Sequence, residues 1–449
     1  MLPKLSRLLP RRGFAHGIHP PESKADTAAQ PIRQFPFAPL MIVPLLQHAG
    51  KAALPVVRAG QEVLRGELLA EPDGPLSVAM HAPASGRIEG IELAPSISGR
   101  MQPAIYLKPH PGSTQEAIEG PPCDVDTASP EQILRAIQWA GIVGLGGAAF
   151  PTHVKLKPPP GKPVDTLVIN GVECEPYLST DHRVMLEQPR DIFQGIRYLL
   201  KVSGARRALI GIEANKADAA GVLRAQRPAG LEVGVELLPV KYPQGAEKML
   251  IKALLGRTGP AGGLPSDIGV LTVNVATCAE IGRLLPRGQG IQERVVTITG
   301  PGVRQRGNYR IPIGTPLRFA LEHVGVSEDL SMVFLGGPMM GQALASLDIP
   351  ITKGSSGFVA FTRAETGRPA VEYPCIHCGY CVQACPMNLN PCDLGRFARK
   401  ERFEEMADGL QLFDCFECGC CSFVCPSHIP LVQSFRVAKN AVRKKRAAP

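Results

Sequence analysis

A doubled cysteine run near the C-terminal end constrains this chain more than any other feature. Ten of the 13 cysteines lie between Cys375 and Cys425. The motif Cys-x-x-Cys-x-x-Cys-x-x-x-Cys-Pro begins at Cys375 and is repeated from Cys415. Three thiolates at this spacing can wrap one [4Fe–4S] cubane, whereas the fourth cysteine lies too far along the chain and ligates the other cluster in two-cluster ferredoxins.

The motif therefore predicts two [4Fe–4S] clusters with crossed ligation. The expected ligands of cluster one are Cys375, Cys378, Cys381 and Cys425. Those of cluster two are Cys385, Cys415, Cys418 and Cys421. Zinc is the alternative, but zinc sites generally use two separated Cys-x-x-Cys pairs, often with histidine. The doubled pattern fits iron–sulfur clusters far better.

Four residues of this region fall outside the pattern. We expect Cys392 and Cys420 to remain packed or free thiols, and His377 and His428 to have supporting or surface positions, because cubane ligation does not need them. The segment 394–406 between the two runs has a helical pattern. A helical ferredoxin fold is therefore expected rather than the compact β-hairpin type.

Positive charge is concentrated at the two ends of the chain. The formal net charge is +9, and residues 1–12 and 443–446 each carry four basic side chains. Nucleic-acid binders instead spread basic residues over a folded face with interleaved aromatics, which are only 5% here. No nucleic-acid partner is expected. The first 14 residues are compatible with a mitochondrial-type presequence, a surface helix or a frayed end.

Neither a disulfide framework nor a membrane span is expected. The chain is long and shows no export signal, so its cysteines are not expected to form disulfides. The longest apolar run, 38–46, has nine residues and two prolines. A membrane helix needs roughly 18–20 apolar residues, so this chain is not expected to cross a membrane by itself.

The high glycine and proline content, 47 and 44 residues, favours short strands and turns. Residues 35–110 resemble the barrel-sandwich fold of biotinyl and lipoyl carriers, with glycine-spaced strands before the turn Ala82-Pro-Ala-Ser-Gly86. Those carriers need a lysine on a hairpin tip. No lysine lies between Lys51 and Lys108, so the fold is expected without the carrier function.

The middle of the chain alternates between strand and helix patterns. Ser129-Pro130 with Gln132 predicts a capped helix that ends near Gly141. Strands are expected at 166–170, 208–212, 233–238 and 270–275, and helices at 191–202, 215–225 and 245–255. This alternation predicts an α/β layer with a mainly parallel sheet. A β-grasp module is expected next, with strand 294–299, helix 315–324 and strand 332–335.

A glycine-rich loop precedes the first of these strands. Gly144-Leu-Gly146-Gly147-Ala-Ala formally matches G-x-G-x-x-A, but a dinucleotide fingerprint requires a strand before the loop, and here a helix precedes it. Two interpretations remain. The loop can let backbone N–H groups approach a phosphate, with Lys155 as a point charge, or it is a structural turn beside a solvated lysine.

Longer motifs carry a family resemblance. Gly146 to Lys155, the stretch Asn170-Gly-Val-Glu173-Cys-Glu175-Pro, and the segments from Tyr242 and Thr272 resemble the NADH-binding flavoprotein subunit of respiratory complex I. The order of segments, from Gly17-Ile-His-Pro-Pro-Glu-Ser-Lys24 to the doubled cysteine run, is closer still to the C subunits of Rnf/Rsx-type ion-translocating oxidoreductase complexes. Many of those relatives carry a long Ala/Lys-rich C-terminal extension that is absent here.

The resemblance implies that the α/β domain holds FMN and takes NAD(H) as substrate. The implied cofactor-binding residues are Gly144, Gly146, Gly147, Lys155, Asn170, Glu173, Tyr242, Gly245, Glu247, Asn274 and Thr277. Glu173 and Glu175 would act as the catalytic carboxylates. Three acidic residues of the family are replaced here, by Val172, Ala246 and Ala276. The resemblance therefore supports the implied NADH contacts less strongly than the implied flavin contacts.

The expected fold class is multidomain α/β plus β, in six segments. These are an N-terminal extension 1–34, a barrel-sandwich hybrid 35–110, a Rossmann-like FMN/NADH domain 125–265, a β-grasp module 268–365, a helical two-cluster ferredoxin domain 368–435 and a basic tail 436–449.

The function implied is that of a peripheral electron-input subunit on the cytoplasmic side of a bacterial inner membrane. Electrons would pass from NADH through FMN to the two clusters, reversibly, and on to integral-membrane subunits that move Na⁺ or H⁺. Ferredoxin or flavodoxin would exchange electrons through the complex, in support of nitrogen fixation or of a redox regulator. The basic ends would face anionic lipid. The alternatives are a flavin-free relay or scaffold, and a diaphorase subunit of a soluble hydrogenase or formate dehydrogenase.

Overall fold

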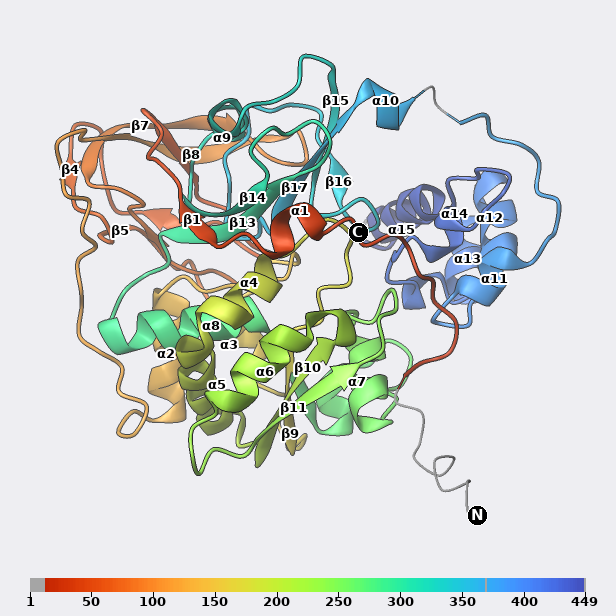
Figure 1. Ribbon diagram of the computed structural model, residues 1–449, viewed down its shortest axis with the longest axis horizontal. Coiled ribbons are helices and arrows are strands. Elements are labelled where there is room, and N and C mark those ends of the chain that lie inside the picture. The colour runs from red at the N-terminus through yellow and green to blue at the C-terminus, as the bar shows by residue number, and fades with distance from the viewer. Residues whose placement is uncertain (1–12, 368–369, 448–449) are drawn as a thin grey trace.

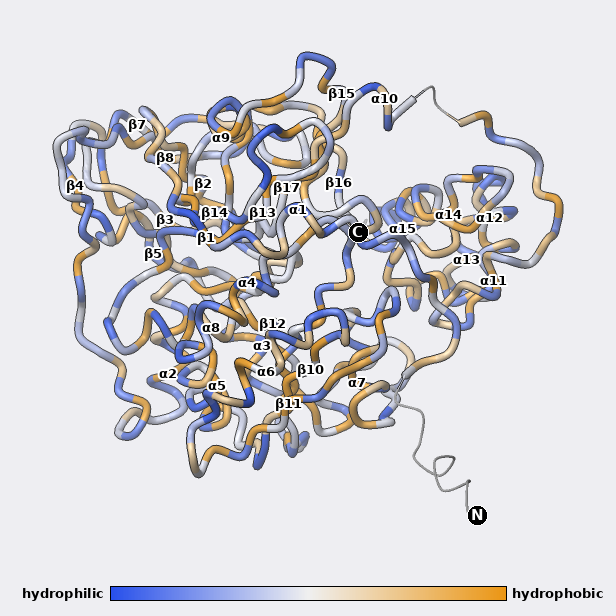
Figure 2. The backbone as a smooth tube through the Cα atoms, in the orientation of Figure 1, coloured by the Kyte–Doolittle hydropathy of each residue, from blue (hydrophilic) through white to orange (hydrophobic). Residues whose placement is uncertain are grey.

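The computed structural model describes residues 13–367 and 370–447, so the basic stretch 1–12 lies outside the described residues. Figure 1 shows three neighbouring bodies: β-rich layers formed by the N-terminal part and by residues near 300–360, an α/β layer below them, and a helical C-terminal body to one side. Figure 2 shows hydrophobic residues along the strands of the α/β layer and hydrophilic residues along outer loops.

The N-terminal body consists of two small antiparallel sheets. The first has the order β2-β8-β7-β4, with bounds Met41–Pro44, Met101–Pro109, Gly86–Pro95 and Glu62–Val63. The second has the order β3-β5-β6, with bounds Leu54–Pro55, Leu68–Glu71 and Met80–His81. Alternate residues of β7 and β8 point inward, and Ile88 and Leu107 are fully buried between the sheets.

The α/β body has a four-stranded parallel sheet in the order β11-β10-β9-β12. These strands span Val233–Leu238, Arg207–Glu213, Thr166–Asn170 and Val270–Asn274. Its longer helices are α2 (Pro130–Trp139), α4 (Thr180–Glu187), α5 (Pro189–Ser203), α6 (Ala217–Ala225), α7 (Glu247–Leu255) and α8 (Val275–Leu284). The expected elements are therefore present with bounds shifted by at most two residues, and α2 begins with the capping box expected of Ser129 and Gln132.

Opposite faces of this sheet pack on different helices because side chains alternate along a strand. Leu167 and Ile169 of β9 join the core that includes α5 and α8, whereas Val168 joins the core that includes α7. Helices α5 and α8 lie very close together. A Cβ on Gly195 would meet the Cys278 carbonyl oxygen at 1.9 Å, so glycine is what permits this contact.

The β-grasp body has a six-stranded sheet in the order β1-β14-β13-β17-β15-β16. Its strands span Ile32–Gln34, Gly307–Pro312, Glu293–Thr299, Gly357–Thr362, Leu330–Leu335 and Gln342–Ala343, and α9 spans Leu317–Val324. Strand β1 comes from the segment expected to be an N-terminal extension. It pairs in parallel with β14, so residues 32–34 are an integral part of this sheet.

The C-terminal body is helical, as expected for its class of ferredoxin. It contains α11 (Tyr380–Ala384), α12 (Pro391–Arg399), α13 (Phe403–Asp408), α14 (Cys420–Phe423) and α15 (Leu431–Ala447). Instead of one helix over 394–406, the structure has two, because the chain turns between them at Glu401 with φ +53°. Further short helices of the described chain are α1 (Ala25–Ala28), α3 (Thr152–Lys155), α10 (Arg363–Thr366), η1 (Ala214–Lys216), η2 (Pro265–Ile268), η3 (Leu285–Arg287) and η4 (Leu412–Asp414).

Residues 436–447, most of the segment expected to be a basic tail, form the greater part of α15. Phe435, Ala438 and Val442 recur at helical spacing and are buried in the core of the C-terminal body. Two of the basic residues pair with helix α13, Lys445 with Glu404 and Arg446 with the same glutamate and with Asp408. In the described part of the chain, no helix is both long and apolar enough to cross a membrane.

Candidate functional site

The strand order of the parallel sheet reverses beside β9, and the carboxyl edge of the sheet at this point, with Asn170 and Asn274, is called the crevice below. From β9 the chain proceeds outward to β10 and β11 and then returns to place β12 on the other side of β9. Ligands of open α/β sheets bind outside the carboxyl ends of the strands at such a switch point. Asn170 and Asn274 are the last residues of β9 and β12 and lie directly opposite one another in the register.

The amide of Asn274 organises one side of this crevice. Its oxygen accepts hydrogen bonds from the N–H groups of Ala276 and Thr277 and so caps α8. Its nitrogen donates to Asp181 at 2.7 Å. The glycine loop lies against it, because a Cβ on Gly146 would come within 3.3 Å of the Asn274 side chain.

The glycine loop is fixed at its base and open at its tip. The N–H of Leu145 donates to the Thr277 hydroxyl at 2.9 Å, and the N–H of Gly144 to the Phe150 carbonyl at 2.8 Å. Gly147 has φ +115° and an exposed position, and a Cβ there would meet no atom within 4 Å. An anchored loop with exposed backbone at its tip fits a phosphate-bearing cofactor.

Lys155 and Glu247, both predicted to contact the cofactor or NADH, form an ion pair. The Lys155 ammonium donates to the Glu247 carboxylate at 2.6 Å and to the Thr272 hydroxyl at 3.0 Å. The two charged side chains are 38% and 36% exposed. An ammonium this accessible can exchange its carboxylate partner for a phosphate oxygen at modest cost.

Asn170 and Gly245 meet at the other side of the crevice. The Asn170 amide donates to the Gly245 carbonyl at 2.9 Å, and its oxygen accepts from the N–H of Val172. A Cβ on Gly245 would lie 2.5 Å from the Val172 carbonyl oxygen, so only glycine fits here. The structure therefore brings the predicted cofactor-binding residues of three separate segments to one edge of the sheet.

The two predicted catalytic carboxylates each accept hydrogen bonds from backbone N–H groups of other segments. Glu173 is buried and accepts hydrogen bonds from the N–H groups of Asp181 and His182, at the beginning of α4. Glu175 accepts from the N–H groups of Met339 and Met340, at 2.6 and 3.0 Å, in the loop between β15 and β16. Burial raises the pKa of Glu175. Both side chains fix other segments around the crevice.

Asp181 lies beside the candidate site, at a position that the sequence did not reveal. Burial, and then the neighbouring Glu173 carboxylate, raise the pKa of Asp181 to about 7. Its contact with Asn274 places it beside the residue against which the glycine loop lies. No spacing signal marks it, because the contact depends on how α4 packs against α8.

The eight motif cysteines gather in two groups, each combining three residues of one run with the last residue of the other. The pKa of Cys381 is raised by burial and by its neighbours, which are Cys378, Cys425 and Cys375. The pKa of Cys421 is raised by burial and by its neighbours Cys415, Cys418 and Cys385. Two sets of four thiols with no disulfide fit two cubanes, because each cubane takes four thiolates.

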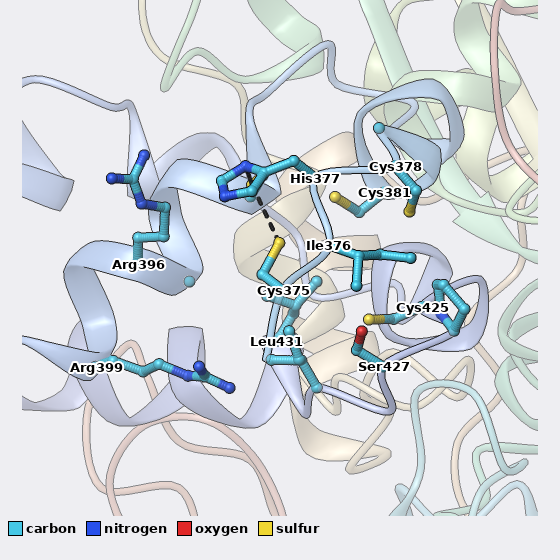
Figure 3. Close-up of a pocket in the computed structure, with 15 residues that line it drawn as sticks. Cys375, Ile376, His377, Cys378, Cys381, Arg396, Arg399, Cys425, Ser427 and Leu431 are labelled. Atoms are coloured by element: carbon cyan, nitrogen blue, oxygen red, sulfur yellow. Dashed lines mark hydrogen bonds between the residues drawn. The ribbon is translucent and has the colours of Figure 1, made fainter. Parts of the chain in front are cut away.

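The two cysteine groups differ in exposure. Cys385, Cys418 and Cys421 of the second group are buried, whereas Cys378 of the first group is exposed. Figure 3 shows the first group at a pocket of the C-terminal body, which Arg396 and Arg399 of α12 also line.

Tyr242 joins the crevice domain to the second cysteine group. The buried phenol donates a hydrogen bond of 2.7 Å to the carbonyl oxygen of Cys418. Tyr242 and Cys418 share a small hydrophobic core with Ile18, Ala384 and Cys420. The backbone of Tyr242 exchanges hydrogen bonds with Ile18, and that of Gly17 bonds Ala384.

The N-terminal segment continues from this joint into the α/β body. Lys24 is buried, and its ammonium donates to the carbonyl oxygens of Glu173 and Leu178, the latter at 2.7 Å. Burial lowers the pKa of Lys24. The segment from Gly17 to Lys24 therefore connects the C-terminal helices with the loop that follows β9.

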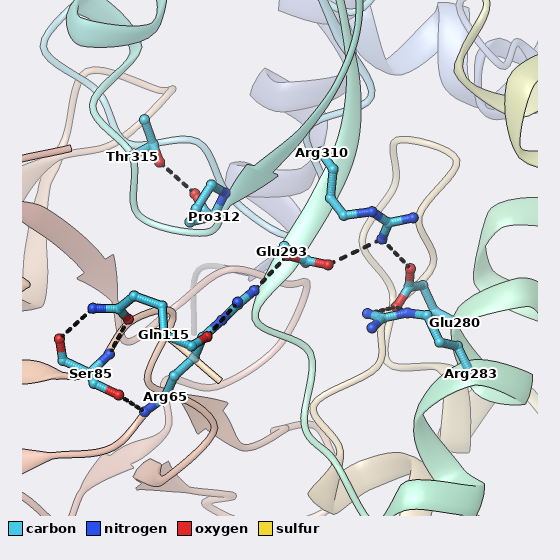
Figure 4. Close-up of polar contacts among 9 residues, drawn as sticks. All are labelled: Arg65, Ser85, Gln115, Glu280, Arg283, Glu293, Arg310, Pro312 and Thr315. Atoms are coloured by element: carbon cyan, nitrogen blue, oxygen red, sulfur yellow. Dashed lines mark hydrogen bonds and ion pairs between the residues drawn. The ribbon is translucent and has the colours of Figure 1, made fainter. Parts of the chain in front are cut away.

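An ion-pair network holds the other bodies together (Figure 4). Arg65 of the N-terminal body contacts Glu293 of β13 at 2.6 Å, and Arg310 of β14 contacts the same carboxylate at 3.2 Å. Arg310 also lies 3.9 Å from Glu280 of α8, which pairs with Arg283. Although burial alone would raise the pKa of Glu293, its arginine neighbours hold it below the usual value.

Family models match four segments of the chain. They describe an RnfC barrel sandwich hybrid domain over residues 12–111, a Nuo51 FMN-binding domain over 137–283, an SLBB domain over 295–343 and a 4Fe-4S dicluster domain over 374–429. These matches confirm the expected fold class and the two cofactor types, FMN and 4Fe-4S clusters.

Curated relatives match almost the whole chain. The chain is 41% identical to the C subunit of the proton-translocating ferredoxin:NAD⁺ oxidoreductase complex of Clostridium ljungdahlii, over 96% of this chain and 94% of the relative. It is 38% identical to the C subunit of the Na⁺-translocating ferredoxin:NAD⁺ oxidoreductase complex of Acetobacterium woodii, over 96% and 98%. The C subunit of the ion-translocating oxidoreductase complex of Rhodobacter capsulatus is also 38% identical, over 99% and 87%.

Other relatives are longer than this chain. The chain covers 64% of the C subunit of an ion-translocating oxidoreductase complex of Haemophilus influenzae, to which it is 41% identical over 95% of its own length. Among solved structures, a chain of an NAD⁺-reducing [NiFe]-hydrogenase in the H₂-reduced state is 18% identical with a TM-score of 0.47, over 72% of this chain and 70% of that one.

Proposed function

Because the chain belongs to the family of the C subunits of ion-translocating oxidoreductase complexes, we propose that it passes electrons between NAD(H) and the rest of such a complex. The named reaction of its relatives is that of a ferredoxin:NAD⁺ oxidoreductase coupled to proton or sodium translocation. In this chain the α/β domain would take NAD(H) and FMN, and the C-terminal body would carry the two clusters.

The contact between Tyr242 and Cys418 carries this proposal. It places a predicted cluster ligand against the segment that also forms the crevice, because Gly245 lies three residues after Tyr242 and contacts Asn170. Electrons entering at the crevice therefore have a packed protein path to cluster two. Because Cys385, Cys418 and Cys421 of the second group are buried and Cys378 of the first group is exposed, the proposed order is crevice, cluster two, cluster one and then a partner subunit.

Several residues of the crevice would hold FMN and NAD(H). The exposed backbone at Gly146 and Gly147 would approach a phosphate, with Lys155 as the charged donor. Asn170, Asn274 and Thr277 would present amide and hydroxyl groups at the carboxyl end of the sheet. Bound FMN supplies the exchange between two-electron and one-electron carriers.

Glu173, Glu175 and Asp181 would act on the cofactors indirectly. Glu173 fixes the beginning of α4 and therefore the position of Asp181, which in turn orients Asn274. Glu175 anchors the loop 336–341 of the β-grasp body beside the same segment. These carboxylates would position the cofactor-binding groups, and Glu247 with Lys155 would be the charged pair that faces the ligands.

The position of the chain in a larger assembly belongs to the same proposal. We expect a peripheral subunit on the cytoplasmic face of a bacterial inner membrane, in contact with membrane and iron–sulfur subunits and exchanging electrons with ferredoxin or flavodoxin through them. Anionic lipid would attract the basic end of α15. Lys445 and Arg446 already pair with Glu404 and Asp408, so that attraction would be weaker than the sequence charge alone implies.

Anaerobic purification followed by NADH titration tests the proposal. We expect one extractable FMN per chain. NADH should bleach the flavin absorbance, and EPR spectra should show that both clusters become reduced. A chain with two clusters but no FMN and no response to NADH would support the flavin-free relay instead. The clusters and the flavin are thus tested separately.

A further inference from the structure

Three donor atoms converge beside the first cysteine group, and two of them belong to residues outside the cluster motif. The sulfur of Cys392 lies 3.7 Å from the sulfur of Cys375 and 3.8 Å from Nδ1 of His377. All three donor atoms lie within 4.8 Å of one another. Figure 3 shows the His377 ring beside Cys375 among the residues that line the pocket.

The two distances from the Cys392 sulfur match two edges of a coordination tetrahedron around a single ion. Two thiolates that bind one zinc at about 2.3 Å lie about 3.8 Å apart, and a thiolate and an imidazole on the same zinc lie about 3.6 Å apart. In a cubane each cysteine binds a different iron, so cluster ligands need not approach one another so closely. The separation of Cys375 and Cys392 therefore fits two ligands of one ion better than two ligands of a cubane.

Helix α12 supports this arrangement. Cys392 is the second residue of this nine-residue helix, which begins at Pro391, and the helix holds its sulfur beside that of Cys375. His377 lies in the loop between Cys375 and Cys378 with φ +57°, and its side chain is exposed. Three protein ligands with one side open to solvent leave a fourth position for water, as in three-ligand zinc sites.

We propose that Cys375, His377 and Cys392 form a second, mononuclear metal site for a divalent cation of the zinc class, zinc or ferrous iron. The site shares Cys375 with cluster one, so the two are mutually exclusive. A chain that lacks cluster one would hold a single metal ion there instead, whereas cluster two is unaffected. This inference goes beyond the electron-transfer function, which requires only the cluster ligands.

Cobalt(II) provides the test, because the optical and NMR spectra of bound Co²⁺ identify its ligands, whereas Zn²⁺ gives no such spectra. The background is the full chain with Cys378→Ala, Cys381→Ala and Cys425→Ala, which removes the other three ligands of cluster one and leaves cluster two assembled on the thiolates of the second group. We expect one Co²⁺ per chain, with thiolate-to-cobalt charge-transfer absorption and a paramagnetically shifted imidazole N–H resonance in the NMR spectrum.

Single changes in this background identify the ligands. Cys392→Ser should weaken Co²⁺ binding by at least about tenfold, and His377→Ala should abolish the shifted imidazole resonance. Cys123→Ser, which alters a thiol elsewhere in the chain, should change neither. Equal affinity in Cys392→Ser, or an unshifted imidazole in the background chain, would overturn the proposal.

A further variant separates this inference from the proposed function. In the otherwise unchanged chain, Cys392→Ser should leave both cluster EPR signals intact, because Cys392 is not a cluster ligand. Loss of cluster one in that variant would mean that Cys392 ligates the cubane, and the mononuclear site would be refuted. A chain that never responds to NADH would contradict the proposed function but would leave the cobalt result unchanged.

Discussion

The hydroxyl of Tyr242 donates a hydrogen bond of 2.7 Å to the carbonyl oxygen of Cys418, across 176 positions of the chain. One partner belongs to the crevice domain and the other to the second cysteine group. Both are buried, so the bond is made in a low-dielectric environment where an unmade bond is costly. Substitution of Tyr242 can therefore test whether this contact affects electron transfer between the two domains.

Tyr242→Phe should remove this bond while both cofactors still load. We expect a loss of about 1–3 kcal/mol in the free energy of unfolding, because the Cys418 carbonyl remains buried without its partner. NADH-driven reduction of cluster two, followed by rapid-freeze EPR, should also slow. Tyr198→Phe is the matched control, since its buried hydroxyl donates to the Cys123 carbonyl within the α/β body. A comparable slowing in the control would show that the effect is general destabilisation.

Single cysteine variants test crossed ligation. Cys425→Ala should abolish the EPR signal of the cluster held by Cys375, Cys378 and Cys381, because Cys425 lies beside Cys381. Cys385→Ala should abolish that of the cluster held by the second run, since Cys385 lies beside Cys421. Iron analysis should then give about four irons per chain in each variant. If each variant instead damages the cluster of its own run, the pairing is wrong.

Lys155→Ala tests the charged side of the crevice. Removing an ammonium that can bind a phosphate oxygen should weaken FMN or NADH binding by about 1.5–3 kcal/mol, roughly a tenfold to hundredfold rise in Kd. Fluorescence titration measures both ligands, and both cluster EPR signals should be unchanged. Lys157→Ala is the control, because Lys157 is an exposed lysine two residues further along the chain and its replacement removes the same charge. Simultaneous loss of ligand binding and clusters would indicate a structural role.

The raised pKa of Asp181 predicts that the stability of the chain depends on pH. Its pKa is about 7 in the folded chain against an ordinary value of 3.8, so between these values the folded state binds the proton that the unfolded state has lost. This contribution to the free energy of unfolding is present below about pH 4 and is lost as the pH rises to about 7. Asp181→Asn should flatten the decline over that range in chemical denaturation. An identical slope in both proteins would contradict the prediction.

Gly245→Ala tests the close approach that shapes the crevice. The added Cβ would lie 2.5 Å from the Val172 carbonyl oxygen, so the backbone must shift. We expect a loss of about 1–3 kcal/mol in the free energy of unfolding and weaker FMN binding. Gly221→Ala in α6 is the opposite control, because no atom lies within 4 Å of its Cβ position and alanine favours a helix. That variant should be slightly more stable than the unchanged chain.

Local patterns predicted much of the fold. Strands β9 and β11 were expected at the bounds that they have, and the Ser129 capping box forms as its sequence indicates. The helix over the C-terminal basic segment was not predicted, because basic residues surround its apolar positions Phe435, Ala438 and Val442. Their helical spacing is recognised only once the core that they pack into is known. The break near Glu401 also escaped prediction, since neither glycine nor proline marks it.

The site was predictable only in part, for a related reason. Asn170 and Asn274 carry the family motifs and lie at strand ends, so their meeting follows from a parallel sheet. The roles of Glu173 and Glu175 do not follow in the same way. Their partners are the start of α4 and the loop beside Met339, and no local pattern encodes those contacts.

The sequence by itself determined the chemistry of the cysteines, because the spacing of thiolates along a short segment decides what they can wrap. It also determined the order of the domains. Only the tertiary structure decided which cysteine group lies beside the crevice, and that Cys392 and His377 converge on Cys375. Such relations depend on how separate helices and loops pack, and packing energy is distributed over many side chains rather than written in any one motif.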